Sequence, residues 1–235
     1  MTKVAIMQPT YLPWAGYFGL MMASDIFIFL DNVQFQKRGW QQRNQIKTLK
    51  GNLFLTVPVK TKNRYNQFVN EVEVDNSTDF KKNHFKSIEF NYNKTDFFKQ
   101  YELELKEIYN KKYDKLVTLN YDLIYWIKEK LNIRTKLIKS SDFEKQGNKD
   151  ELITNLVEKV NSKNYLFTEG SKDYILDSKI FQYKKIKLTK FDFNIEVYKQ
   201  QYENFLPYMS IIDLLFNLGE KSEAYLKKNI NLEDV

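Results

Sequence analysis

The residue types best suited to chemistry are concentrated between Gln8 and Asn44. This segment holds half of the prolines, half of the arginines and two of the three tryptophans of the chain. Proline and glycine set the shape of a loop, and the planar guanidinium group of arginine binds carboxylate or phosphate through paired hydrogen bonds. The clustering predicts a preformed ligand site, with a chance accumulation of rare residues as the alternative.

The first half of this segment reads QPTYLPWAGYF. Two prolines preset its course, and Gly16 allows the backbone to approach a ligand at the start of a helix. It contains neither GxGxxG nor GxxxxGK[ST], so it holds no complete phosphate-binding motif. A rigid turn with aromatic packing is the structural alternative to a binding loop. The residues of this half that we expect to bind substrate are Gln8, Tyr11, Gly16 and Tyr17.

The second half, DNVQFQKRGWQQRN, combines one carboxylate with cations and amides. These groups suit it to orient a phosphorylated sugar and to polarise an acceptor. Asp31 is predicted to be a general base, with a metal-ligand role as the alternative, and Lys37 to hold phosphate or an oxyanion. A solvated charged loop anchored by Trp40 is the structural alternative. The predicted substrate-binding residues of this half are Gln34, Arg38, Trp40, Arg43 and Asn44.

Candidate residues outside the segment are fewer. His84 is the only histidine and lies in a predicted helix, where it is either an acid–base catalyst or a structural residue. With one histidine and no cysteine, a metal site of clustered His and Cys is excluded. Further predicted substrate-binding residues follow predicted strands or begin a helix, and helix capping explains the serines among them equally well. They are Ser140, Ser141, Gly170, Tyr174 and Ser210.

The elements that must position these residues begin with a βαβ unit. Residues 3–7 are predicted to form a buried strand, 16–23 an apolar helix and 25–30 a second strand. Such a unit implies a parallel sheet with ligands at the carboxyl ends of its strands, where both Gln8 and Asp31 would lie.

In the rest of the chain the hydrophobic pattern changes from that of strands to that of helices, and then back to alternating strands and helices. Residues 53–59 and 71–75 are predicted strands, and helical spacing runs from 77 to 131. The α/β pattern then resumes. It contains a strand from 135, a helix over 149–160, strands at 165–170 and around 186–197, and a last helix near 210. We therefore expect an α/β, Rossmann-like fold with a mainly parallel sheet, as one domain over residues 1–235 with a helical insertion at about 77–132.

Composition narrows the class of protein. The absence of cysteine excludes disulfides and thiolate chemistry and fits a reducing cytoplasm. The apolar start VAIM is too short for a signal peptide, and no apolar run has the roughly 20 residues of a membrane span. The net charge of +7 comes from lysines interleaved with acidic residues, so nucleic acid is not the expected partner. We expect a cytoplasmic protein, and the oligomeric state is left open.

The stretch VAIMQPTYLPWAGYF, with DIFIFLDNVQFQKRGWQQRNQI and LTVPV after it, resembles the WbqC-like family. Weaker echoes in NHFKSI, IKSSD, TEGSKDYI and MSIIDLL extend the resemblance over nearly the whole chain. The resemblance implies a role in O-antigen, lipopolysaccharide, capsule or related glycan assembly.

The order of strand, PTYLPWAGYF and DIFIFLDNVQF also resembles the start of the HxGH nucleotidyltransferase superfamily, which includes pantothenate synthetase. That similarity implies ATP as an optional co-substrate. The stretch from Trp14 to Tyr17 keeps the glycine of HxGH but neither histidine, and Asp213 replaces a basic residue expected near the carboxyl end. We therefore favour a preactivated donor, with no certain cofactor.

These observations lead to one leading hypothesis and two alternatives. The leading one is a transferase or ligase that modifies a nucleotide-linked amino sugar by joining an acyl or aminoacyl group to its amine. Its partners would be the nucleotide-linked sugar and an acyl or aminoacyl donor. The alternatives are a glycosyltransferase that uses a nucleotide sugar and a non-catalytic sugar-nucleotide-binding assembly protein.

Overall fold

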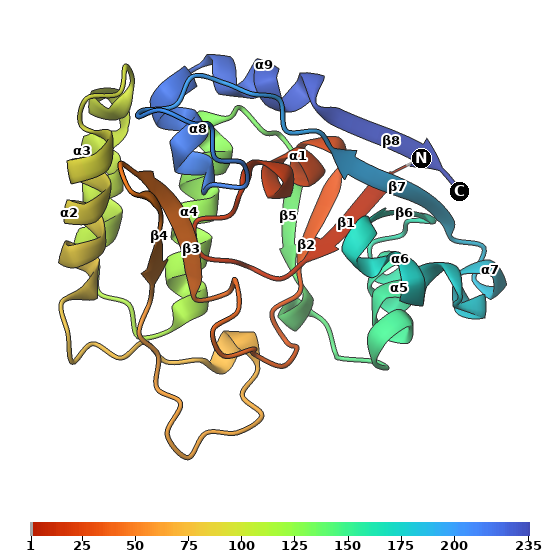
Figure 1. The fold of residues 1–235 in the computed structure, drawn as a ribbon. Coiled ribbons are helices and arrows are strands. Elements are labelled where there is room, and N and C mark those ends of the chain that lie inside the picture. Colours follow the sequence, from red (N-terminus) through yellow and green to blue (C-terminus); the bar gives the residue numbers. More distant parts are fainter. Residues whose placement is uncertain (1) are drawn as a thin grey trace.

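The computed structural model describes residues 2–235, apart from the side chains of residues 173 and 174 (Figure 1). A six-stranded, mostly parallel sheet lies between helices, which confirms the predicted α/β, Rossmann-like fold. Its strands are β1 (Lys3–Met7), β2 (Ile26–Phe29), β5 (Lys136–Lys139), β6 (Asn164–Thr168), β7 (Lys187–Phe193) and β8 (Ile230–Asp234). The helices are α1 (Ala15–Ala23), α2 (Phe80–Tyr92), α3 (Phe98–Asn110), α4 (Leu116–Lys130), α5 (Lys149–Lys159), α6 (Lys172–Leu176), α7 (Lys179–Tyr183), α8 (Ile211–Leu218) and α9 (Lys221–Lys228).

The strand order fixes where a ligand site is expected. The order across the sheet is β5-β2-β1-β6-β7-β8, and all neighbours are parallel except β7 and β8. From β1 the chain builds outward to β2 and β5, and it then returns to the other side of β1 with β6. The order therefore reverses between β1 and β6, the type of position at which open α/β sheets bind ligands.

Successive side chains along each strand point to opposite faces of the sheet, so the strands contribute to two hydrophobic cores, one on each face. Ala5, Phe27 and Leu166 belong to the core shared with α1, α4 and α8. Ile6 and Phe167 face the other way, into the core shared with α5, α6 and α7. Strands buried on both faces read as nearly continuous apolar runs, which is why VAIM and IFIF are recognisable in the sequence.

A second layer stands beside the sheet (Figure 1). The antiparallel hairpin of β3 (Arg43–Thr48) and β4 (Gly51–Thr56) packs near α2. The helices α2, α3 and α4, which come between β4 and β5 in the sequence, form a helical layer. The predicted helical periodicity over 77–131 is confirmed by these three helices.

Some predicted elements were wrong or absent. Residues 71–75 form no strand, because Val69–Glu71 is a 3-10 turn and Val74 makes only an isolated bridge to Val59. The strand β3 was not predicted, because its sequence RNQIKT contains a single apolar residue and so lacks the apolar–polar alternation of a strand. The edge strand β8 was not predicted either, and neither were the helices α6, α7 and α9.

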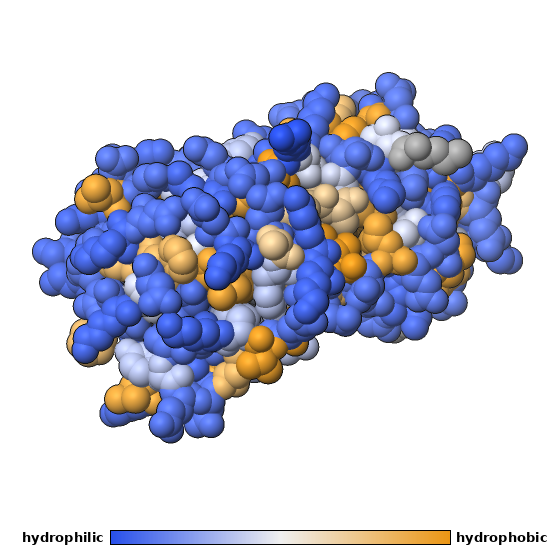
Figure 2. All heavy atoms as spheres, turned by 90° about the horizontal axis from the view of Figure 1, so that it is seen from above, coloured by the Kyte–Doolittle hydropathy of each residue, from blue (hydrophilic) through white to orange (hydrophobic). Residues whose placement is uncertain are grey.

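The face seen in Figure 2 is mainly hydrophilic, with hydrophobic side chains in separate groups. Many surface lysines lie in ion pairs with nearby carboxylates, as Lys184 does with Glu158 at 2.8 Å. This arrangement agrees with a solvated charged surface. Within residues 2–235, no helix has the length and apolar character needed to cross a membrane.

Candidate functional site

A cavity of about 490 Å³ opens at the carboxyl edge of the sheet, between β1 and β6. Gln8 directly follows β1, and Gly170 and Ser171 follow β6, so the cavity occupies the point at which the strand order reverses. We call it the sheet-edge cavity. Its lining residues are Ile6, Met7, Gln8, Thr10, Leu20, Leu30, Gln36, Gly39, Trp40, Gln41, Ile153, Tyr165, Leu166, Thr168, Gly170 and Ser171.

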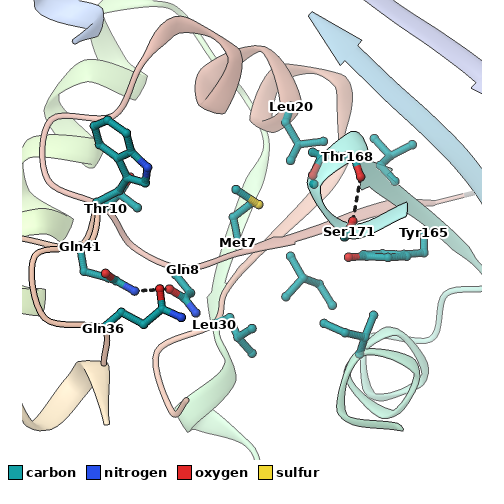
Figure 3. A pocket seen from close by; sticks show the side chains of 16 residues that line it. Met7, Gln8, Thr10, Leu20, Leu30, Gln36, Gln41, Tyr165, Thr168 and Ser171 are labelled. Carbon is teal, nitrogen blue, oxygen red and sulfur yellow. Dashed lines mark hydrogen bonds between the residues drawn. The ribbon is translucent and has the colours of Figure 1, made fainter. Parts of the chain in front are cut away.

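Three glutamine side chains gather at one end of this cavity, and Thr168 and Ser171 lie at the other (Figure 3). Gln41 donates a hydrogen bond from Nε2 to Oε1 of Gln8. Gln41 is 4% exposed, and its own Oε1 has no hydrogen-bond partner among the described residues. A buried acceptor without a partner costs free energy, so a ligand N–H or O–H that reached Gln41 would be bound favourably.

Uncharged groups make up the described lining of the sheet-edge cavity. In the part of the chain that the structure describes, no Asp, Glu, Lys, Arg or His lines it. A buried phosphate or carboxylate needs a cation or several donors to replace its water. Amide and hydroxyl groups instead match the hydroxyl and amide groups of an uncharged polar ligand, such as a sugar ring.

Asn120 of α4 holds the two loops that form the amide end of the cavity. It is fully buried, and its Nδ2 donates to the backbone oxygen of Pro9 at 3.1 Å and to that of Gln41 at 2.8 Å. The amide N–H of Tyr11 joins the same two loops by donating to the Trp40 oxygen at 3.0 Å. Sequence reasoning missed Asn120, and the one available signal was an amide inside the apolar helix LVTLNYDLIYW.

Asp31 lies at the predicted edge but does not line the cavity. It is 1% exposed, and its oxygens accept hydrogen bonds from Ser140, Ser141 and Tyr121 at 2.7–2.9 Å. These contacts tie the end of β2 to the end of β5 and to α4. A carboxylate saturated in this way is placed to hold the sheet edge together, and the geometry favours that role over proton transfer to a substrate.

His84 and Tyr11 meet in a buried cluster behind the loop. The Tyr11 hydroxyl lies 2.8 Å from Nδ1 of His84 and also hydrogen-bonds to the hydroxyl of Tyr109. Burial lowers the pKa of His84 to about 4, although a hydrogen bond to the Thr56 backbone opposes the shift. His84 lines neither the sheet-edge cavity nor the aromatic compartment defined below, and it is neutral at pH 7. The arrangement favours its structural alternative.

A smaller cavity of about 250 Å³ adjoins the first and shares Met7, Thr10 and Trp40 with it. We call it the aromatic compartment. Its lining residues are Met7, Thr10, Pro13, Trp14, Tyr17, Trp40, Asn44 and Tyr208. The predicted binding residues Tyr17, Trp40 and Asn44 are therefore brought together here. Tyr17 donates from its hydroxyl to the Gln8 oxygen at 3.3 Å, and burial raises the pKa of that hydroxyl well above its usual value.

Other predicted site residues lie outside both cavities. Arg43 lines neither cavity, and its guanidinium group lies over the ring of Phe54 at 4.8 Å. Gln34 is exposed and donates to Asn66 at 3.3 Å. Lys37 and Arg38 are exposed on the turn between Gln36 and Gly39. This turn places both cations beside the sheet-edge cavity rather than in its lining.

The remaining predicted site residues lie in different parts of the structure. Gly170 lines the sheet-edge cavity, whereas Ser140 and Ser141 bind Asp31. Gly16 does not line either cavity, since the ring of Trp14 covers it. Ser210 precedes α8, with a buried hydroxyl that has no partner among the described residues. Tyr174 belongs to α6, but its side chain lies outside the described residues.

Sequence reasoning named Gln8, Trp40 and Gly170 among the cavity residues but missed most of the polar ones. Gln36 and Gln41 lie in the segment between Gln8 and Asn44, and the local sequence does not distinguish these two glutamines from Gln34, which lies outside the cavity. Thr168 ends β6 and Ser171 follows it. The rule that ligands bind after parallel strands pointed to the loop that contains Ser171, whereas Thr168 was missed because it was taken as part of the strand.

Comparisons with known proteins place this chain among relatives of similar length. The model of the WbqC-like protein family matches residues 8–225. The chain is 38% identical over 229 residues to Rv1507c of Mycobacterium tuberculosis, which is described as uncharacterized; the match covers 97% of this chain and 98% of that protein. No solved structure gives a significant match.

Proposed function

Because the chain belongs to the WbqC-like protein family, we propose that it acts in surface-polysaccharide biosynthesis on a nucleotide-linked amino sugar. The reaction in this proposal is transfer of an acyl or aminoacyl group to the sugar amine, by a transferase or ligase. The observation that carries the proposal is the uncharged, amide-rich sheet-edge cavity at the point where the strand order reverses.

The polar groups of this cavity suit an amino sugar. Its described lining offers amides and hydroxyls without a charged side chain, which matches sugar hydroxyl groups. The buried Oε1 of Gln41 is an acceptor for an N–H, and the amine of the sugar is the group that supplies one. Gln41 would thereby fix the position of the nucleophile.

In this proposal the site accelerates the reaction mainly by positioning. The amine nitrogen attacks the carbonyl carbon of an activated donor such as a thioester, the bond to the leaving group breaks, and the amine proton leaves with the released thiol. Holding two reactants in the correct orientation contributes several kcal/mol to a reaction of this kind. No carboxylate, imidazole or ammonium group lines the cavity within the described part of the chain, and the neutral form of the amine attacks an activated donor without one.

The cellular setting follows from the same proposal. Nucleotide-linked sugars are substrates of the cytoplasm, and the absence of cysteine from the sequence fits that reducing compartment.

The test is a product assay with the purified protein. Nucleotide-linked amino sugars are incubated with acyl and aminoacyl thioesters, and products are identified by mass spectrometry. We expect an N-acylated nucleotide sugar, and turnover that falls at least tenfold in Gln41→Leu. Transfer of the sugar itself, with release of nucleoside diphosphate, would establish the glycosyltransferase alternative. Binding of the sugar without any product would establish the non-catalytic alternative.

A further inference from the structure

The aromatic compartment has partly exposed aromatic rings at the surface of the site. Trp40 is 54% exposed and Tyr208 is 60% exposed, although both line this cavity. The rings of Trp14 and Tyr208 have centroids 5.4 Å apart and are inclined by 58°, so they form a corner rather than a closed stack. Large aromatic surfaces that remain uncovered beside a cavity mark a binding site for another apolar or aromatic group.

The walls of the compartment are held in place before any ligand arrives. A Cβ atom on Gly16 would lie 2.2 Å from the Trp14 ring, so the absence of a side chain there lets the indole lie against the start of α1. Phe193 also contacts the indole in an edge-on arrangement, with centroids 5.8 Å apart. Tyr208 is fixed through its backbone, because its oxygen accepts a hydrogen bond from Gln45 at 3.2 Å.

From this geometry we propose that the aromatic compartment binds the nucleobase of the nucleotide-linked sugar, while the sheet-edge cavity binds the sugar; this inference rests on the proposed function. A planar heteroaromatic ring can stack on open Trp and Tyr faces, and stacking on aromatic side chains contributes substantially to binding of bases. The volume of about 250 Å³ suits one such ring system, and the larger neighbouring cavity remains for the sugar.

Polar groups in the compartment can meet the edge of a base. The Asn44 amide donates to the Leu12 oxygen at 2.7 Å and accepts from the amide N–H of Gln45 at 2.8 Å. Each of its two polar atoms keeps one further hydrogen-bonding position. Thr10 lines both cavities, so its hydroxyl lies where base and sugar would approach each other.

The charged part of the ligand would lie at the rim. Neither cavity has a charged side chain in its described lining, so a diphosphate would not be stabilised inside. Lys37 and Arg38 are exposed on the turn whose neighbours Gln36 and Gly39 line the sheet-edge cavity. Neither cation forms an ion pair with any residue that the structure describes. They are available to neutralise phosphate beside the cavity.

The experiment measures binding to the two cavities separately, with probes that each represent one part of a nucleotide-linked sugar. Titration calorimetry is run with UDP, dTDP, GDP and ADP as one set of probes and with glucosamine 1-phosphate as the other. We expect Trp40→Leu and Tyr208→Leu each to weaken binding of the preferred nucleoside diphosphate about tenfold or more. Binding of glucosamine 1-phosphate to Tyr208→Leu should stay within twofold, because Tyr208 lines only the aromatic compartment.

A matched control guards against general effects of removing an exposed ring. Tyr183 is 86% exposed and lines neither cavity, so Tyr183→Leu should bind both kinds of probe like the unchanged protein. Gln41→Leu should show the converse pattern, with glucosamine 1-phosphate weakened and nucleoside diphosphate retained. Thermal melting of every variant verifies that it is folded.

The outcomes distinguish this inference from the proposed function. If nucleoside diphosphates do not bind, or bind equally well to Trp40→Leu and Tyr208→Leu, the nucleobase assignment is overturned even when acyl transfer is observed. If the ring variants lose nucleotide affinity but no product forms with any donor, the nucleobase assignment stands and the proposed transferase reaction is overturned.

Discussion

Both carboxylate oxygens of Asp31 accept hydrogen bonds from Ser141. The Ser141 backbone N–H donates to one oxygen at 2.9 Å, and its hydroxyl donates to the other at 2.7 Å. The pair joins the ends of two neighbouring parallel strands, β2 and β5, across 110 residues of sequence. The residue that sequence reasoning favoured as a general base is therefore one that links the carboxyl ends of β2 and β5.

Asp31→Asn should destabilise the protein strongly. An asparagine NH₂ would face donors that now bind a carboxylate, so we expect the free energy of unfolding to fall by about 2–4 kcal/mol. Urea denaturation measures this loss, and Ser141→Ala should show a smaller loss of about 1 kcal/mol. An Asp31→Asn protein of unchanged stability that has lost all turnover would instead restore the role of general base.

His84 should give the protein a specific sensitivity to mild acid. Its folded-state pKa of about 4 lies below the ordinary value of 6.5, so the folded state resists protonation. The stability from neutral His84 is complete above pH 6.5 and is lost as the pH falls towards 4, by about 3 kcal/mol in total. Because the chain has a single histidine, the difference between the unchanged protein and His84→Gln isolates this effect in urea titrations at several pH values. Parallel pH profiles for the two proteins would refute the assignment.

Asn120→Leu should lower both stability and ligand affinity, although Asn120 does not line the cavity. The substitution removes both hydrogen bonds that α4 makes to the Pro9 and Gln41 carbonyl groups, and it leaves those acceptors buried. We expect a loss of about 2–3 kcal/mol in unfolding free energy and weaker binding of glucosamine 1-phosphate. Asn120→Asp keeps the shape of the side chain but puts a carboxyl group against the two carbonyl oxygens, so it should lower stability at least as much as leucine does. Normal sugar affinity in both variants would show that Asn120 does not position the loops.

Two glycines of the same cavity should respond differently to alanine. A Cβ atom at Gly39 would lie 2.3 Å from Oε1 of Gln41 and 2.9 Å from the Gln36 backbone oxygen, so Gly39→Ala must displace the amide end. A Cβ atom at Gly170 would meet nothing within 4 Å. Calorimetry should show sugar phosphate affinity about tenfold lower in Gly39→Ala, roughly the equivalent of one hydrogen bond, and unchanged in Gly170→Ala. Equal affinities would mean that Gln41 does not contact the ligand.

ATP consumption separates a transferase from a ligase. The stretch from Trp14 to Tyr17 lacks both histidines of the HxGH motif, whose usual role is to stabilise charge on a triphosphate. We expect no ATP turnover when a free acid, ATP and a nucleotide-linked amino sugar are combined, and amide product only with a preactivated donor. Formation of amide together with AMP and pyrophosphate, detected by mass spectrometry, would show that the protein is a ligase.

The fold was largely predictable, whereas the composition of the site was only partly so. Strands buried on both faces, such as β1 and β2, can be recognised in the sequence by their apolar runs. Ligand-binding residues can then be predicted in the loops that follow them, because parallel sheets bind ligands at the carboxyl ends of their strands. The polar hairpin strand β3 gives no such signal. For Asn120 the sequence offered only the signal of an amide inside an apolar helix. Its role depends on which distant loops pack against α4, and local spacing carries no information about that packing.

The strand order also has a kinetic consequence. Lys3 pairs with Asn164, and the walls of the sheet-edge cavity come from residues 6–41 and 153–171, with the helical layer between them in sequence. Helices form through local contacts in microseconds, whereas pairing between distant strands must first close a long loop. When the denatured chain refolds, helical circular dichroism should therefore return before the ability to bind ligand does.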